Sequence, residues 1–240
     1  MYKYETHCHS SEGSLCSHIT AEELVHLYKQ HGFDGIFVTD HFFNGNTSVD
    51  RNQPWEKKIE DYCSSFEKAE KIGREEGLSV FFGWEYSYNY IGKKGKWCGG
   101  NDFLTYGLNK EWLLKHPEVM DFELREYCDF IHQNGGFIIH AHPFRNSDYI
   151  DMIRLVPESV DGVEVINSSM TNEHINKMAD IYANEYGLLK TAGSDMHGRE
   201  YERISGILTE NPIKCPMDML AELKSGKTKL FVEKNPLPKK

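Results

Sequence analysis

Short apolar runs alternate with longer amphipathic segments along most of the chain. The apolar runs are bounded by glycine or aspartate, a pattern that suits strands buried on both faces of a parallel sheet. They cover residues 35–41, 78–87, 102–108, 135–142, 161–167, 188–197 and 203–209. The amphipathic segments predict helices over residues 20–31, 55–76, 121–134, 172–186 and 216–225. The first helix begins with Thr20 and Glu23 at the spacing of a capping box.

The alternation of strands and helices predicts an α/β fold. About seven such units in 240 residues favour a barrel over an open sheet, and barrels of roughly 200–250 residues often form a single unit. Because no linker, low-complexity tract or sequence repeat divides the chain, residues 1–240 are expected to form one domain. The lysine- and glycine-rich stretch 92–100 is expected to be a loop, and the tail from about residue 234 to be frayed.

The composition excludes several classes of protein. Hydrophobic residues make up 39%, enough to bury a core, which excludes a disordered chain. No apolar run approaches the ~20 residues of a membrane span, and the N-terminus is too polar for a signal peptide. We therefore expect a cytoplasmic protein without a membrane partner. The net charge of −10 disfavours long nucleic acid as a partner. The six cysteines contain no CxxC pair and are expected to be reduced thiols.

Histidines and carboxylates gather where the predicted strands end. His7 and His9 end a first strand, in the sequence ETHCHS. The others are Asp40 and His41, Glu85, His140 and His142, and Asp195 and His197. Any one pair is a weak signal, since a lone HxH is most often structural. In an α/β barrel, however, the carboxyl ends of the strands meet at one rim, so these side chains should converge. Imidazoles and carboxylates together suit Zn, Mn or Fe(II) rather than Ca. The set therefore indicates a metal centre.

Five motifs resemble the PHP (polymerase and histidinol phosphatase) domain family. They are HCHS, VTDH, GWE, AHPFR and GSDMH, in that order between residues 7 and 197. The resemblance covers nearly the whole chain. It implies a distorted (β/α)7 TIM-like barrel with two or three divalent metal ions, Zn, Mn or Fe, at its C-terminal rim. It also implies hydrolysis of phosphate esters.

The resemblance further implies which residues bind the first two metals. His7 and His9 match the HxH motif and would hold the first metal together with Asp195. Glu85 matches the carboxylate that bridges the first and second metals. His142, the histidine of the HP dipeptide, would bind the second metal.

His41 and His197 match ligands of a third metal. At this metal the sequence departs from the family, which commonly has Asp or His a few residues beyond HxH. The segment here reads SSEGSLCSH, so Cys16 is the first candidate, followed by His18 and then Glu12. A thiolate ligand would favour Zn or Fe(II), while a buried thiol with no role in binding is the alternative.

A second departure lies after Glu85, where the family often has a histidine that opens the next strand. Asp102, or else Asn101, stands there and could bind the second metal. Arg145 follows the AHPF sequence, just outside the second metal, where its guanidinium could hold phosphate oxygens. His140 and Asn167 face the same rim and are expected to support the ligands rather than to bind metal.

The residues and the resemblance together predict a metal-dependent phosphoesterase. Its substrate would be a small phosphomonoester, or a nucleotide or oligonucleotide phosphoester, attacked by metal-activated hydroxide. Asp195, His197 and Arg145 are the candidate catalytic residues. One alternative is an amidohydrolase-like enzyme that cleaves a C–N bond, and another is a non-catalytic PHP barrel that acts as a binding module. Asp195 and His197, paired around Met196, favour the phosphoesterase, as does Glu85.

Overall fold

The apolar runs form the strands of one strongly curved sheet in the computed structural model, which describes residues 1–91 and 97–235. Within these residues the sheet has nine strands in the order β7-β6-β5-β4-β3-β2-β1-β8-β9. The strands are β1 (Tyr2–Cys8), β2 (Gly35–Val38), β3 (Ser79–Ile91), β4 (Trp97–Tyr106), β5 (Phe137–Ala141), β6 (Gly162–Asn167), β7 (Leu189–Gly193), β8 (Arg203–Thr209) and β9 (Lys229–Lys234).

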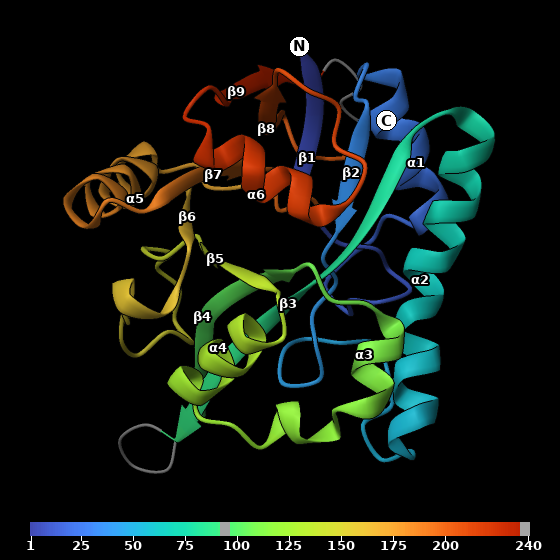
Figure 1. The fold of residues 1–240 in the computed structure, drawn as a ribbon, viewed down its shortest axis with the longest axis vertical. Coiled ribbons are helices and arrows are strands. Elements are labelled where there is room, and N and C mark those ends of the chain that lie inside the picture. Colours follow the sequence, from blue (N-terminus) through green and yellow to red (C-terminus); the bar gives the residue numbers. More distant parts are fainter. Residues whose placement is uncertain (92–96, 236–240) are drawn as a thin grey trace.

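Helices surround the sheet, with α1 and α2 side by side on one flank and α5 on the opposite flank (Figure 1). The helices are α1 (Ala21–Gln30), α2 (Trp55–Glu76), α3 (Lys110–Lys115), α4 (Leu124–Gln133), α5 (Glu173–Tyr186) and α6 (Pro216–Lys224). All except α3 correspond to helices predicted from the amphipathic pattern. The capping box of α1 is present as predicted, because the backbone N–H of Glu23 donates to the Thr20 hydroxyl over 3.2 Å. The α/β class is therefore confirmed.

The sheet is nearly closed into a barrel because the chain beyond β7 returns to β1. The Asp195 backbone N–H donates to the His7 carbonyl over 2.8 Å, and the His9 N–H donates to the Met196 carbonyl over 2.9 Å. Parallel pairing joins β1 to β2 and β2 to β3, and it also joins β5 to β6 and β6 to β7. The carboxyl ends of these six strands consequently meet at one rim of a single domain.

The strand directions differ from a regular strand–helix repeat. β4 runs antiparallel to both β3 and β5, and β8 runs antiparallel to β1 and β9. The predicted seven-unit repeat is therefore replaced by a mixed sheet, because an apolar run carries no information about strand direction. β3 also continues to Ile91, so Glu85 lies within the strand and not at its end. A parallel bridge pairs Glu85 with His41, which follows β2, so Glu85 still lies at the level of the rim.

The predicted loop at 92–100 and the predicted frayed tail differ from the structure in where they begin or end. Of the stretch 92–100, residues 97–100 belong to β4 and residues 92–96 lie outside the described part of the chain. The apolar pattern predicts neither α3 nor β9, and β9 orders the chain through residue 234. The rest of the predicted frayed tail, residues 236–240, lies outside the described residues.

Large apolar side chains hold the strand ends in place. Trp84, Phe37 and Phe137 are buried, with relative exposures of at most 1%, and burying a side chain of this size contributes roughly 1.5–3 kcal/mol. The cysteines whose side chains are described, Cys8, Cys16, Cys63, Cys128 and Cys215, are free thiols. In the described chain, no helix has both the length and the apolar character needed to cross a membrane.

Candidate metal centre

Glu85 lies at the middle of a cluster of imidazole rings at the rim. Its Oε2 is 2.7 Å from His41 Nδ1 and 3.5 Å from His9 Nε2. Its Oε1 is 3.3 Å from His142 Nε2 and 3.5 Å from His7 Nε2. The carboxylate is fully buried, yet neither oxygen receives a hydrogen bond of good geometry from any described residue. Buried carboxylate oxygens normally have such partners, so both oxygens are free to bind a cation.

Asp195 supplies a second buried carboxylate to the same cluster. Its Oδ1 lies 3.3 Å from His9 Nε2, 3.4 Å from His197 Nδ1 and 3.5 Å from His7 Nε2. This oxygen also lacks a hydrogen-bond partner within the described chain. Asp195 has a φ of 52° and His142 a φ of 26°, both in the left-handed region that non-glycine residues seldom adopt. Such backbone conformations cost on the order of 1–3 kcal/mol each and gather at functional sites.

Within the described residues, the ligand atoms form three groups, each with all its atoms within 4.8 Å of one another. The groups are His7, His9 and Asp195; His7, Glu85 and His142; and His9, His41 and His197. The first group is the set that the sequence assigns to the first metal. The other two groups contain the residues assigned to the second and third metals, and each also includes a histidine assigned to the first, His7 or His9. Imidazole nitrogens and carboxylate oxygens are common ligands of divalent metal ions. The donor set and the unpartnered carboxylate oxygens thus fit divalent metal ions.

Charge within the cluster is balanced by the protein's own groups. Burial by itself would raise the pKa of Glu85, but His41 and His7 outweigh it and hold the pKa well below its usual range. Conversely, burial would lower the pKa of His41, and the Glu85 carboxylate raises it well above its usual range. The lowered pKa favours the ionised form of Glu85, which is the form that binds a cation.

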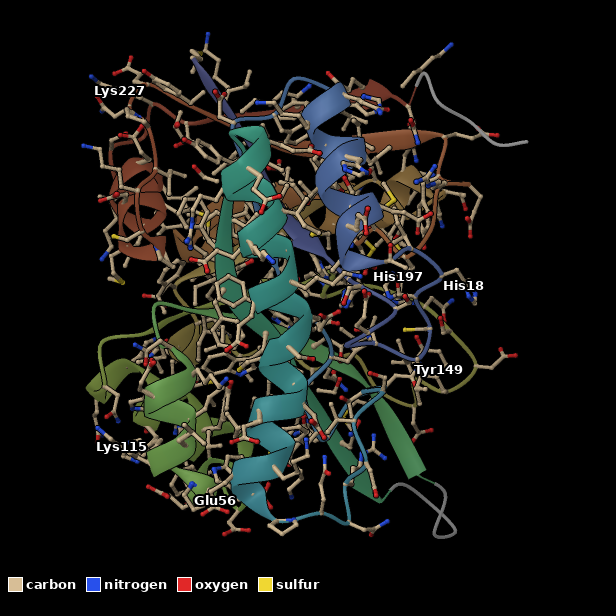
Figure 2. All side chains as sticks on the ribbon, turned by 90° about the vertical axis from the view of Figure 1, so that its right-hand side faces the viewer. His18, Glu56, Lys115, Tyr149, His197 and Lys227 are labelled. Atoms are coloured by element: carbon tan, nitrogen blue, oxygen red, sulfur yellow. The ribbon has the colours of Figure 1, made fainter. Side chains whose placement is uncertain are left out.

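The structure separates the three candidates in the segment after HxH. Cys16 lies at the rim and lines the same cavity as His197 and His41. Burial opposes the thiolate, but these two histidines outweigh it and lower the pKa of Cys16 to about 6. His18 is exposed and lies further out than His197 (Figure 2). Glu12 accepts a hydrogen bond from the first N–H of α1 and pairs with a surface lysine. Only Cys16 thus lies beside the cluster.

A cavity of about 840 Å³ opens onto the cluster, and Cys16, His41, Asp195 and His197 form part of its wall. Asp102 also lines this cavity and accepts a hydrogen bond from the Ser87 hydroxyl over 2.6 Å. Among the described residues, Asp102 and Cys16 belong to none of the three ligand groups. Their role as ligands stays a prediction.

Arg145 reaches the cavity from the loop that follows β5. Its Nη1 lies 3.7 Å from Asp195 Oδ2, and its guanidinium lies 5.9 Å from the ring centre of Tyr149. The Asp195 carboxylate offsets the effect of burial and raises the pKa of Arg145. A permanent positive charge therefore lies beside the cluster of histidines and carboxylates, on a cavity wall, and its predicted role in holding phosphate stays a prediction.

Two rim residues support the structure instead of facing the cavity. Asp40 is buried and accepts hydrogen bonds from the hydroxyls of Ser10, Ser14 and Ser65 and from the Ser10 backbone N–H. It thereby fixes the loop after β1. His140 stacks on Phe103 with ring centres 4.6 Å apart, and burial lowers its pKa to about 3. A neutral histidine packed in this way agrees with its predicted supporting position.

Glu164 on β6 is a buried residue of the site that sequence reasoning missed. Its Oε1 lies 2.9 Å from His7 Nδ1, and its Oε2 accepts hydrogen bonds from the His142 N–H over 3.1 Å and from Asn167 Nδ2 over 2.9 Å. Asn167 also reaches Asp195 Oδ2 over 3.4 Å, which agrees with its predicted supporting position. The signal available was a glutamate within the otherwise apolar run GVEVI.

Comparison with known proteins supports the predicted fold. No protein-family profile and no curated protein matches the sequence. Among solved structures, a two-domain protein from Bacteroides vulgatus that contains a predicted PHP-like metal-dependent phosphoesterase superposes with a TM-score of 0.64 at 14% identity. The match covers 96% of this chain and 64% of that protein, so the chain spans less than two thirds of its length. The chain has a PHP-like fold.

Two further structures share this PHP-like fold over nearly their whole length. A candidate metal-dependent phosphoesterase from Bifidobacterium adolescentis matches with a TM-score of 0.55 at 14% identity, over 92% of this chain and 95% of its own. An amidohydrolase from Chromobacterium violaceum, solved with bound sulfate and no metal, matches with a TM-score of 0.56 at 14% identity. That match covers 97% of this chain and 98% of the amidohydrolase. Identities this low establish the PHP-like fold alone.

Proposed function

We propose that this protein is a metal-dependent phosphoesterase acting on a small phosphomonoester or on a nucleotide or oligonucleotide phosphoester. The observation that carries the proposal is the position of Glu85. Its two unpartnered oxygens face different pairs of imidazoles, His41 with His9 and His142 with His7. A carboxylate placed in this way would hold a cation on each side, and it lies beside a cavity large enough for a small phosphorylated molecule.

The residues of the three ligand groups would hold two or three divalent ions, with Cys16 and Asp102 as additional candidate ligands. Such ions supply Lewis acidity, which lowers the pKa of water and neutralises phosphoryl oxygens. Arg145 binds the phosphoryl group from the cavity wall, where its guanidinium can donate two parallel hydrogen bonds to the oxygens. This places the phosphorus between the cluster and a fixed positive charge.

His197 is the residue best placed to move a proton. Its Nδ1 lies 2.9 Å from the Asp195 carbonyl oxygen and donates to it, which leaves Nε2 as the atom available to a ligand or a leaving group. The ring lines the cavity and is mostly buried, and the Asp195 carboxylate raises its pKa against the effect of burial. With only two ions bound, Nε2 keeps its proton and His197 can act as a general acid toward a leaving alkoxide. A third ion bound at Nε2 would take the place of that proton and make His197 a ligand instead.

The test is a substrate panel on protein stripped of metal and then reloaded with Mn or Zn. We expect turnover of p-nitrophenyl phosphate or bis(p-nitrophenyl) phosphate that requires the added metal, and elemental analysis showing at least one metal per chain. Nucleotides and short oligonucleotides extend the panel. A metal-loaded protein that hydrolyses none of these esters would contradict the proposal.

Hydrolysis of a C–N bond is the second candidate, favoured by the amidohydrolase that shares the fold. The same panel distinguishes the two if it includes p-nitroacetanilide and a cyclic amide. If the amides release amine and none of the esters releases phosphate, the protein is an amidohydrolase-like enzyme and not a phosphoesterase. Metal binding without turnover of either class would indicate a binding module.

A further inference from the structure

Glu164 is completely buried and touches two of the candidate metal ligands at once. One carboxylate oxygen lies 2.9 Å from His7 Nδ1, and the other accepts the backbone N–H of His142 over 3.1 Å. Gly193 on the neighbouring strand β7 makes room for this contact. A Cβ atom there would come within 2.5 Å of the His7 Cβ and 2.6 Å of Glu164 Oε1.

The contact with His7 determines which ring nitrogen is available to a metal. A carboxylate accepts hydrogen bonds, so the proton of the His7 ring is held on Nδ1. Nε2 is then the nitrogen with a free lone pair, and it is the one that faces the cluster, 3.0 Å from His9 Nε2 and 3.5 Å from Asp195 Oδ1. His7 belongs to two of the three ligand groups found in the described residues. Its tautomer therefore affects both groups.

The contacts of the other oxygen reach the remaining ligands. Oε2 accepts the N–H of His142, whose φ of 26° requires support from its surroundings. It also accepts a hydrogen bond from Asn167 Nδ2, which in turn reaches Asp195 Oδ2 over 3.4 Å. Glu164 thus connects His7, His142 and Asp195 from behind the cluster, without facing the cavity.

We propose that Glu164 is the positioning residue of the metal centre, which fixes the His7 tautomer with Nε2 free and couples His7 to the backbone of His142. The proposal rests on the metal centre of the proposed function. It is specific to the carboxylate, because Oε2 already receives two donors. A glutamine would keep its single oxygen on that side and turn its NH₂ toward His7 Nδ1. The His7 proton would then move to Nε2 and block metal binding.

The experiment compares zinc binding by the wild type, Glu164→Gln and a matched control, Glu222→Gln. Glu222 is also a buried glutamate that accepts backbone hydrogen bonds, from Glu210 over 3.0 Å and Asn211 over 3.5 Å, and it lies on α6. Competition against a chromophoric chelator should show zinc bound about 10–100-fold more weakly by Glu164→Gln. Glu222→Gln should bind zinc as the wild type does.

A second measurement stands on the wild type alone and covers the case in which Glu164→Gln does not fold. In NMR spectra of the zinc-loaded protein with ¹⁵N-labelled histidine, the His7 proton should be on Nδ1, and the chemical shift of Nε2 should be that of a zinc-bound nitrogen. Zinc bound at Nδ1, or wild-type zinc affinity in folded Glu164→Gln, would overturn the proposal. A wild type that binds zinc in this manner but hydrolyses no ester refutes only the proposed function, whereas a wild type that binds no zinc refutes both.

Discussion

Replacing Glu85 by glutamine is the most direct perturbation of the centre, because it changes charge and leaves shape nearly unchanged. Both oxygens of Glu85 lie 2.7–3.5 Å from imidazole nitrogens, and the side chain is fully buried. The glutamine side chain has the same volume, so the fold should persist. The amide, however, presents an NH₂ group to one pair of imidazoles and removes the negative charge from both.

The magnitude follows from what one preorganised electrostatic group contributes. Removing a single such group typically costs about 2.7–4 kcal/mol of transition-state stabilisation. Glu85 faces ligand atoms on two sides, so the loss should be at least ~3 kcal/mol, or more than about 100-fold in kcat. Because the carboxylate also contributes to metal binding, the metal affinity should fall as well.

The assay measures kcat and metal content together, at metal concentrations that saturate the variant. Equal occupancy in the wild type and in Glu85→Gln separates the loss of chemistry from the loss of metal. Glu222→Gln serves again as the control for removing a buried carboxylate elsewhere, and it should change stability without changing kcat. Near-wild-type turnover by Glu85→Gln at full occupancy would refute the reasoning that Glu85 is shared between cations.

Three further predictions concern residues around the centre. Arg145→Ala should raise KM, lower kcat or do both, without removing metal. Arg145→Lys should restore only part of kcat/KM, and the control Arg74→Ala, at an exposed position, should have no effect. If Arg145→Ala keeps full kcat/KM on every active ester, Arg145 is a loop charge. In metal-free protein, alkylation of Cys16 by iodoacetamide should rise with pH through about 6, where its thiol ionises, while Cys63, whose pKa burial raises to about 12, stays unreactive. A reaction at Cys16 that zinc does not slow would argue against thiolate ligation. Asp40→Ala should lower the free energy of unfolding in urea by at least ~2 kcal/mol, because it leaves buried hydroxyls and an N–H without their acceptor, and an unchanged midpoint would contradict this.

Most helices and strands, and the kinds of side chain that form the cluster, could be predicted from the order of the residues. Helix α2 spans the predicted residues 55–76, because an amphipathic period and a terminal glycine are local properties of the chain. The motif histidines, Glu85 and Asp195 could be named because imidazoles and carboxylates at the ends of successive apolar runs are the side chains that bind divalent metals. Those predictions needed only the residue types and their order.

Which partner each of those residues contacts depends on the folded structure. The antiparallel direction of β4 and the position of Glu85 within β3 depend on hydrogen bonds between strands, which an apolar run does not encode. Asp40 and Asp195 are both aspartates that follow a strand. Serine hydroxyls donate hydrogen bonds to the oxygens of Asp40, while one oxygen of Asp195 has no hydrogen-bond partner in the part of the chain that the structure describes. Glu164 touches His7 across 157 residues of sequence. What a buried polar side chain does is determined by the partners that folding brings within reach, and these lie too far apart along the chain to be read from it.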